Sequence, residues 1–261
     1  MYSLVNKVRQ INPLVLHYTN DVTINDCANT TLAIGASPLM SFSYEEVEDL
    51  VGIASCVVIN VGTMNSDNLD LYVLAGKAAN KLKKRLVLDP VGVFASKARQ
   101  ELVKRLLNEV RFDVVKGNVD EIKFIGGFDV KGKGVDSFDD GEDYTEVIKR
   151  VAKKLECVVA STGKIDIVTN GTNTYKIENG TKKLKSITGT GCMTASLIGS
   201  YISCTDDILQ GAAMGVLTMS LSGELADCDN PPIGTFKVEL MNQIYSIDEE
   251  TFCNNSKIEL V

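Results

Sequence analysis

The short stretch TGTGC, from Thr188 to Cys192, has the residue types of a ligand-binding loop and leads into an apolar segment with a helical pattern. Glycines let a backbone approach a ligand closely, and the free N–H groups at a helix N-terminus attract anions. The candidate catalytic residues are therefore Gly189, Thr190, Gly191 and Cys192. The same positive field would lower the pKa of the Cys192 thiol. An ordinary turn with a helix cap and a buried thiol explains this spacing about equally well.

Polar side chains also follow two apolar runs that read as buried strands. VLDPVG places Asp89 at the end of one run, and VVKGNVDEI places Lys116, Asn118 and Glu121 at the end of another. Ligands collect at the carboxyl ends of parallel strands, and two carboxylates there suit a Mg²⁺ ion that keeps most of its waters and bridges phosphate oxygens. Asn118 and Glu121 also match the N-x-x-E pattern of a helix capping box, which is the stronger interpretation of that pair taken alone.

Three further positions could contact a ligand. Asn25 lies on an expected helix, where it could orient a heterocycle by hydrogen bonds, and Met40 could cover such a ring. Thr162 ends the apolar run VVAST and could contact phosphate. The plainer alternatives are that Asn25 serves a turn or cap, that Met40 fills the core, and that Thr162 begins a loop.

Composition limits the classes of function. A formal net charge of −7 argues against binding nucleic acid or an anionic membrane through bulk electrostatics. The N-terminus has no uninterrupted apolar run of a signal peptide, and no segment approaches the length of a membrane span, so we expect a cytoplasmic protein. Seven widely spaced cysteines without a C-x-x-C pair, and one histidine, fit neither a disulfide framework nor a zinc site.

Short apolar runs alternate with helical patterns along most of the chain. Strands are expected within 13–18, 56–62, 86–92, 112–118 and 157–162, and helices within 26–36, 68–85, 97–110, 143–156, 206–226 and, as the last one, 234–247. Continuous apolar strands between helices predict a three-layer α/β/α fold with a mostly parallel central sheet. Residues 165–188 read as a hairpin around TNGTN with a second turn at ENGT, which predicts antiparallel strands at one edge of that sheet.

The rest of the pattern concerns chain organisation. The polar, glycine-rich segment 126–143 predicts a long surface loop or lid. Residues 206–226 contain too many small side chains for a solvent-facing helix, so this helix should pack closely against its neighbours. Because no repeat or low-complexity linker occurs, we expect a single domain over residues 1–261.

Together these motifs resemble one family. PLVLHYTNDVTINDCANTTLAIGASPLM, NVGTMN, VLDPVG, KGNVDEI, GKGVDS and TGTGCMTA occur in the order and spacing of the hydroxyethylthiazole kinase family, from about Pro13 to the final helices. The resemblance implies a ribokinase-like fold and transfer of the ATP γ-phosphate, with Mg²⁺, to the primary alcohol of 4-methyl-5-(2-hydroxyethyl)thiazole, a step of thiamine biosynthesis or salvage. It also implies a homotrimer with the substrate site between subunits.

The resemblance assigns roles by motif position. It implies thiazole contacts by Met40 and Gly189 with Asn25 beside them, ATP contacts by Lys116 and Thr162 with Asn118 nearby, and Mg²⁺ or phosphate-side roles for Asp89 and Glu121. Cys192 stands where most ribokinase-like kinases have an aspartate base. The chain departs from the family in having Lys116 at a position that is usually arginine, Leu16 where the family's H-x-x-T-N has histidine, and Val93 and Phe94 where small residues are usual.

Two other interpretations stay open from the sequence. A different ribokinase-like enzyme, such as a hydroxymethylpyrimidine kinase or an ATP-dependent hydrate dehydratase, would have aspartate at the Cys192 position and would lack TNDVTINDCAN. A non-catalytic thiazole- or nucleotide-binding protein could have kept the pocket without turnover. The retained Asp89 and Glu121 argue against that second alternative, while Lys116 argues weakly for it.

Overall fold

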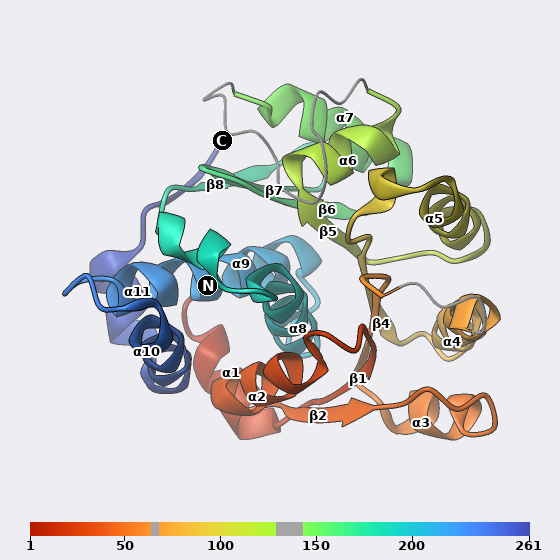
Figure 1. The fold of residues 1–261 in the computed structure, drawn as a ribbon, viewed down its shortest axis with the longest axis horizontal. Helices are drawn as coiled ribbons and strands as arrows, with labels where there is room; N and C mark the ends of the chain where they lie inside the picture. Colours follow the sequence, from red (N-terminus) through yellow and green to blue (C-terminus); the bar gives the residue numbers. More distant parts are fainter. Residues whose placement is uncertain (64–67, 129–142) are drawn as a thin grey trace.

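The computed structural model describes residues 1–63, 68–128 and 143–261. These residues form three layers, with helices on both faces of one central sheet (Figure 1). The strands, in the spatial order β2-β1-β3-β4-β5-β6-β7-β8-β9, are β1 (Leu14–Tyr18), β2 (Ser37–Met40), β3 (Cys56–Asn60), β4 (Arg85–Asp89), β5 (Val114–Asn118), β6 (Val158–Thr162), β7 (Asp166–Thr169), β8 (Thr174–Ile177) and β9 (Ile258–Leu260). The predicted three-layer α/β/α architecture is confirmed.

Strand pairing is parallel from β2 through to β6. β3, with the sequence CVVIN, is buried at every position because helices cover the sheet on both faces. The expected hairpin is formed by β7 and β8, which pair antiparallel, and β6 and β9 join it on either side with antiparallel pairing as well. The prediction of antiparallel strands at one edge of a mostly parallel sheet is therefore confirmed.

Each sheet face buries its own apolar core. Successive strand side chains point to opposite faces, so Val15 and Val58 enter one core while Leu16 and Val57 enter the other. The first core is covered by α1 (Leu4–Ile11), α2 (Ile24–Ile34), α8 (Thr190–Ile202), α9 (Ile208–Ala226), α10 (Ile233–Ser246) and α11 (Glu249–Asn255). The second is covered by α3 (Val47–Ile53), α4 (Leu69–Lys81), α5 (Lys97–Glu109), α6 (Val119–Gly126) and α7 (Thr145–Leu155).

Some elements differ from the sequence-based expectation. The helix expected as the last one is α10, but α11 and β9 follow it, so that prediction of its place was wrong. α11 is too short to show a clear period, and it begins at a cap in which the Asp248 side chain accepts a hydrogen bond from the Thr251 amide. The helices α1 and α3 were not predicted either. Of the segment 126–143, which we expected to form a loop or lid, residues 129–142 lie outside the part of the chain that the structure describes.

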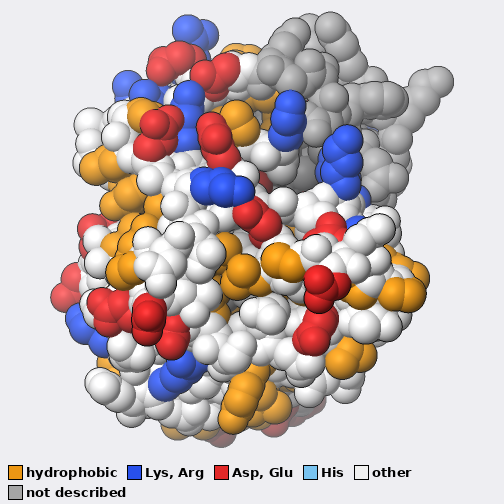
Figure 2. Space-filling model, turned by 90° about the vertical axis from the view of Figure 1, so that its left-hand side faces the viewer, with side chains coloured by type: hydrophobic (Ala, Val, Ile, Leu, Met, Phe, Trp, Pro, Cys, Tyr) orange, Lys and Arg blue, Asp and Glu red, His pale blue; other side chains and the backbone are white. Residues whose placement is uncertain are grey.

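The described surface and helices bear on possible partners. On the face shown in Figure 2, Lys and Arg side chains lie among Asp and Glu side chains and do not gather into one basic area. Such a face offers an anionic polymer little electrostatic attraction. Across the described residues, no helix combines the length and the apolar character needed to cross a membrane.

The two long helices α8 and α9 pack closely, as expected from the small residues of 206–226. Gly215 of α9 lies against the backbone of α8, where a Cβ at this position would be 2.6 Å from both Cα and N of Ile198. Because the neighbouring atoms belong to a helix backbone, a side chain here could be accommodated only by moving the two helices apart. This contact matters for the site because α8 begins at the TGTGC motif.

We therefore expect Gly215→Ala to lower the free energy of unfolding by about 1–3 kcal/mol, the usual cost of overpacking a core. The measurement is urea unfolding followed by circular dichroism. Gly234→Ala is a matched control, since Gly234 lies in α10 with no atom within 4 Å of the added Cβ. Alanine is the better helix former, so the control should be neutral or slightly stabilising. Equal stability of Gly215→Ala and the wild-type protein would contradict the close packing.

Candidate functional site

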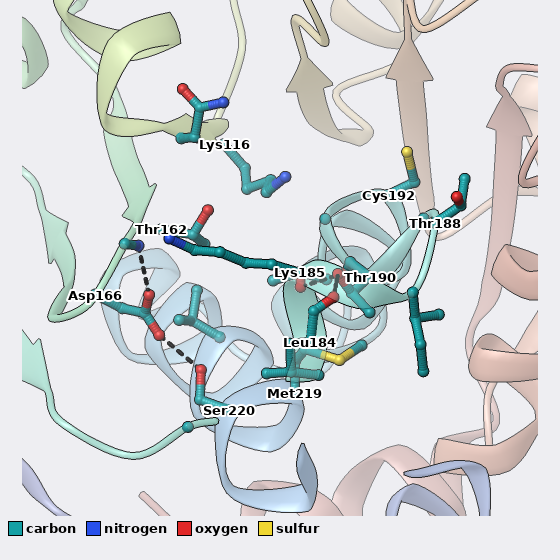
Figure 3. Close-up of a pocket in the computed structure, with 18 of the residues that line it drawn as sticks. Lys116, Thr162, Asp166, Leu184, Lys185, Thr188, Thr190, Cys192, Met219 and Ser220 are labelled. Atoms are coloured by element: carbon teal, nitrogen blue, oxygen red, sulfur yellow. Dashed lines mark hydrogen bonds between the residues drawn. The ribbon is translucent and has the colours of Figure 1, made fainter. Parts of the chain in front are cut away.

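A pocket of about 820 Å³ lies where the ends of the parallel strands meet the N-terminus of α8 (Figure 3). It brings together most of the residues selected from the sequence, namely Lys116, Asn118, Glu121, Thr162, Gly189, Thr190, Gly191 and Cys192. Asp89 is completely buried directly behind this wall, within 3.5 Å of the Lys116 ammonium. The sheet therefore places strand-end polar groups opposite the glycine-rich loop, as its parallel topology predicts.

The TGTGC motif forms the first turn of α8. Gly189 is the N-cap residue with φ +93°, and a Cβ there would lie 2.6 Å from Cγ2 of Thr23. Both the left-handed backbone and the close contact therefore require glycine. The N-cap residue Gly189 has no side chain that could cap this helix end, and the first turn has no acidic residue. The N–H groups of this turn are thus open to an anion in the pocket.

The side chain of Lys116 reaches from β5 to this same turn. Its ammonium is 3.5 Å from Oδ1 of Asp89, and a Cβ on Gly191 would lie 2.9 Å from Nζ. Gly191 therefore leaves the space that the ammonium occupies. Burial by itself would lower the pKa of Lys116, but Asp89, Glu121 and Cys192 raise it above the usual lysine value. The pocket wall thus carries a fixed positive charge beside the helix N-terminus.

Asp89 is held by two asparagines that sequence reasoning missed. The Asn60 amide donates to Oδ2 of Asp89 over 2.8 Å, and the Asn20 amide donates to Oδ1 of Asn60 over 2.9 Å. Burial raises the pKa of Asp89, while Lys116 and Asn60 oppose this shift. Asn60 ends an apolar strand and pairs in register with Asp89. The rule that selected Asp89 would therefore have selected Asn60 as well.

Asn118 and Glu121 form the capping box that their spacing suggested. Oδ1 of Asn118 accepts a hydrogen bond from the Glu121 amide over 2.9 Å, and Oε2 of Glu121 accepts one from the Asn118 amide over 2.8 Å. Oε1 of Glu121 accepts a third hydrogen bond from the Gly92 amide over 2.8 Å. Burial raises the pKa of Glu121 to about 7, with Lys116 opposing the shift. Glu121 therefore organises the backbone around the pocket as well as lining it.

The predicted lowering of the Cys192 pKa was wrong. The thiol is only 8% exposed, and burial together with the charge of Asp89 raises its pKa above the usual cysteine value, despite the opposing effect of Lys116. The prediction considered the positive field of the helix N-terminus but not the loss of hydration on burial, which disfavours the charged thiolate. The Asn20 amide donates to Sγ over 3.4 Å. Cys192 is therefore a protonated thiol at neutral pH.

Asn25 and Met40 do not line the pocket of their own chain. Asn25 is exposed on α2, where its side-chain oxygen accepts a hydrogen bond from Asn29 over 2.9 Å. Met40 is the half-buried last residue of β2, at the edge of the sheet. Within a single copy of the chain, these two candidates therefore lie outside the pocket that most of the other selected residues line.

An acid that sequence reasoning missed, Asp166, lies at the far end of the pocket. The carboxylate of Asp166 accepts hydrogen bonds from the Gly163 amide over 2.9 Å and from the Ser220 hydroxyl over 2.6 Å (Figure 3). It thereby joins the turn after Thr162 to α9. Burial raises the pKa of Asp166 to about 6, and these hydrogen bonds oppose the shift. Asp166 begins its strand instead of ending one, so the strand-end rule passed over it.

The arrangement of acids can be compared with what a metal ion requires. Within the described residues, no group of three His, Cys, Asp or Glu side chains is placed to hold a metal ion. Asp89 and Glu121 accept hydrogen bonds from the protein but keep further lone pairs on their oxygens. Mg²⁺ usually keeps several waters and takes one or two carboxylates together with substrate phosphates. The two acids fit that mode and do not form an all-protein cage.

The raised pKa of Asp166 predicts a specific dependence of stability on pH. The native state binds this proton more tightly than the unfolded chain, whose aspartates titrate near pH 4, so the stabilisation is present below about pH 4 and is lost as pH rises through about 6. The asparagine side chain in Asp166→Asn has nearly the shape of a protonated aspartate, and it does not titrate. We expect its free energy of unfolding, relative to wild type, to increase by up to about 3 kcal/mol between pH 4 and pH 7. Urea unfolding at a series of pH values measures this difference, and a constant difference would contradict the burial of a charged Asp166.

Comparison with known proteins agrees with this geometry. The chain is 70% identical over its full length to a hydroxyethylthiazole kinase from Clostridioides difficile (strain 630), all of which it covers. The solved structure of a hydroxyethylthiazole kinase protein from Pyrococcus horikoshii OT3 is 34% identical, with a TM-score of 0.91 over 100% of this chain and 98% of that one. An ADP complex of Bacillus subtilis pyridoxal kinase, 14% identical with a TM-score of 0.62 over 81% of this chain and 91% of that one, shares the fold. Residues 5–250 match the model of the hydroxyethylthiazole kinase family, to which the chain therefore belongs.

Proposed function

We propose that this pocket binds ATP with Mg²⁺ and transfers the γ-phosphate to the primary alcohol of 4-methyl-5-(2-hydroxyethyl)thiazole, in thiamine biosynthesis or salvage. The observation that carries the proposal is the uncapped N-terminus of α8 facing the Lys116 ammonium in the same pocket. The helix N-terminus and the ammonium both stabilise negative charge at the same place in the pocket. Membership of the family supports the choice of the thiazole alcohol as the acceptor.

Phosphoryl transfer depends mainly on positioning and on neutralising charge in the transition state. The amides of residues 189–192 and the Lys116 ammonium would stabilise the charge on the transferring group. Thr162 lies at the end of β6, where its hydroxyl donates a long 3.4 Å hydrogen bond to the Gly117 carbonyl and could also contact a phosphate oxygen. The side chain of Lys185 extends across the pocket toward Thr162 and adds a second cation for the polyphosphate (Figure 3).

Two acids lie on this side of the pocket, with Glu121 lining it and Asp89 buried directly behind its wall. Asp89 and Glu121 would contact the water ligands of a Mg²⁺ ion that enters with the nucleotide. When bound, the ion would neutralise phosphate charge. Asn118, next to Glu121, would lie beside the same phosphates.

Cys192 has a different role from the aspartate base of other ribokinase-like kinases. Its raised pKa keeps the thiol protonated at neutral pH, so it is a poor base. A loose transition state leaves the proton on the attacking hydroxyl until late in the transfer, so a strong base is not required. Cys192 would instead contact the acceptor alcohol at the end of α8 and help to orient it.

This role predicts different results for two substitutions. Cys192→Ala should keep more than about 1% of the wild-type kcat, because losing a true general base costs about 10²–10⁴-fold. Asp89→Asn should lower kcat by about 100-fold or more, because it removes a buried charge beside the transferring group. Cys157→Ala, at a half-buried cysteine outside the pocket, is the matched control and should behave as wild type. Complete loss of turnover in folded Cys192→Ala would show that the thiol is the base.

The function itself is tested by ADP release from ATP and Mg²⁺, with hydroxyethylthiazole, with hydroxymethylpyrimidine and without an acceptor. We expect turnover that depends on the thiazole and is abolished by EDTA. Preference for the pyrimidine would support the alternative kinase. Binding of the thiazole without ADP release would support a binding protein.

All seven cysteines are free, which agrees with the reducing cytoplasm where we place this reaction.

We also propose a homotrimer in which a neighbouring subunit completes each thiazole site. Asn25 and Met40 lie outside the pocket of their own chain, so a thiazole contact by these residues requires a second copy. Large apolar side chains are exposed near them, with Val22 64%, Leu32 56% and Phe42 38% exposed. Val22 also lines the pocket, which places this apolar surface at its mouth.

Light scattering should give about three times the 28.3 kDa mass of the chain. A mixing experiment tests where the site lies. Asp89→Asn and Met40→Ala subunits should each show low activity alone, and activity should rise when they are unfolded together and reassembled, because some mixed sites then contain neither substitution. A monomeric mass, or no gain on mixing, would contradict a shared site.

A further inference from the structure

Arg99, near the start of α5, binds backbone carbonyls of two different loops. Its Nη1 donates to the Val61 carbonyl over 2.7 Å and to the Val91 carbonyl over 3.0 Å, and its Nη2 donates to the Gly62 carbonyl over 2.8 Å. Gly62 and Val91 both line the pocket, whereas Arg99 does not. Within the part of the chain that the structure describes, Arg99 forms no ion pair with an acid, so its charge serves these carbonyls.

The two loops follow neighbouring strands. Residues 61 and 62 leave β3, and residues 90–92 leave β4, with the Val61 amide donating to the Asp89 carbonyl over 3.2 Å. Three carbonyl oxygens that converge on one point repel one another unless a cation lies between them. The planar guanidinium has five N–H donors in a fixed fork and can satisfy all three. The shorter, pointlike ammonium of lysine cannot do so from the same position.

One peptide group is held from both ends. The carbonyl of the Val91–Gly92 peptide accepts from Arg99, and the N–H of that same peptide donates to Oε1 of Glu121 over 2.8 Å. A rotation of this peptide plane would break both hydrogen bonds. Gly92 has φ +65°, a conformation in which such a rotation has little intrinsic steric cost, so the hydrogen bonds to Arg99 and Glu121 fix the plane.

We propose that Arg99 is a positioning residue, which acts with Glu121 to hold the Val91–Gly92 peptide and the wall formed by Gly62. The inference rests on the proposed function for its kinetic readout. Because Glu121 is bound to this peptide, loss of Arg99 would let Glu121 shift relative to Lys116 and the first turn of α8. A displacement of about 1 Å at a reacting centre can cost about 10²-fold in rate.

The test compares Arg99→Ala, Arg99→Lys and Arg105→Ala. Arg105 lies on the same helix, where it pairs with Asp70 and Glu109 at the surface, and its variant should keep the wild-type kcat. We expect folded Arg99→Ala to lose at least about tenfold in kcat while the KM for the thiazole changes less than about threefold. Millimolar guanidinium should restore a large part of the loss, and methylammonium at equal ionic strength should not. Arg99→Lys should fold and still be impaired, which keeps the test usable if the alanine variant is unstable.

Hydrogen exchange gives a readout that does not depend on turnover. Peptides that cover residues 61–62 and 91–92 should exchange faster in Arg99→Ala than in wild type, and guanidinium should slow them again. Wild-type kcat in either Arg99 variant, or no rescue of a folded and impaired Arg99→Ala, would overturn the inference. Absence of turnover in the wild-type enzyme would count against the proposed function alone, and the exchange rates would then decide the inference: equal rates in variant and wild type would overturn it.

Discussion

The structure of this pocket depends on keeping one ammonium and two carboxyl groups buried together. Lys116, Asp89 and Glu121 are each at most 3% exposed. Removing charges from water costs several kcal/mol per ion unless hydrogen bonds and opposite charges replace the lost hydration. Here the replacement comes from the Asn60 amide on Asp89 and from two backbone amides on Glu121. The fold must therefore place those hydrogen-bond donors at fixed positions beside the buried groups.

The parallel sheet meets that requirement through its register. Asn60 pairs with Asp89 across β3 and β4, and Asn118 pairs with Thr162 across β5 and β6, so polar side chains that end different strands lie level with one another. The residues that precede these strand ends are mostly apolar and buried, which prevents a slip that would carry polar groups into a core. α8 closes the arrangement from the other side. Its position in turn depends on the contact between Gly215 and Ile198 in the core.

The sequence predicted those features that depend on one element and its end. Apolar runs located the parallel strands β1, β3, β4, β5 and β6 but not the edge strand β2, and the strand-end rule found Asp89, Lys116 and Thr162. It did not find groups whose role depends on the meeting of distant segments. The raised pKa of Cys192 arises from burial between strand ends far from it in the chain. Asp166 begins a strand, and Arg99 binds backbone carbonyls, which leave no mark in residue types.

Gly191 leaves room for the ammonium of Lys116, at a position where the resemblance to the family leads us to expect arginine. Lysine offers a compact point charge in place of arginine's planar fork, so it must lie close to the charge that it neutralises. Gly191 permits this, because even one Cβ there would come within 2.9 Å of the ammonium. The lysine thereby joins the amides of α8 instead of forming a separate contact. The charge neutralisation that we propose for this wall would thus be a joint property of β5 and the first turn of α8, and an arginine at position 116 would have to find another place for its larger head group.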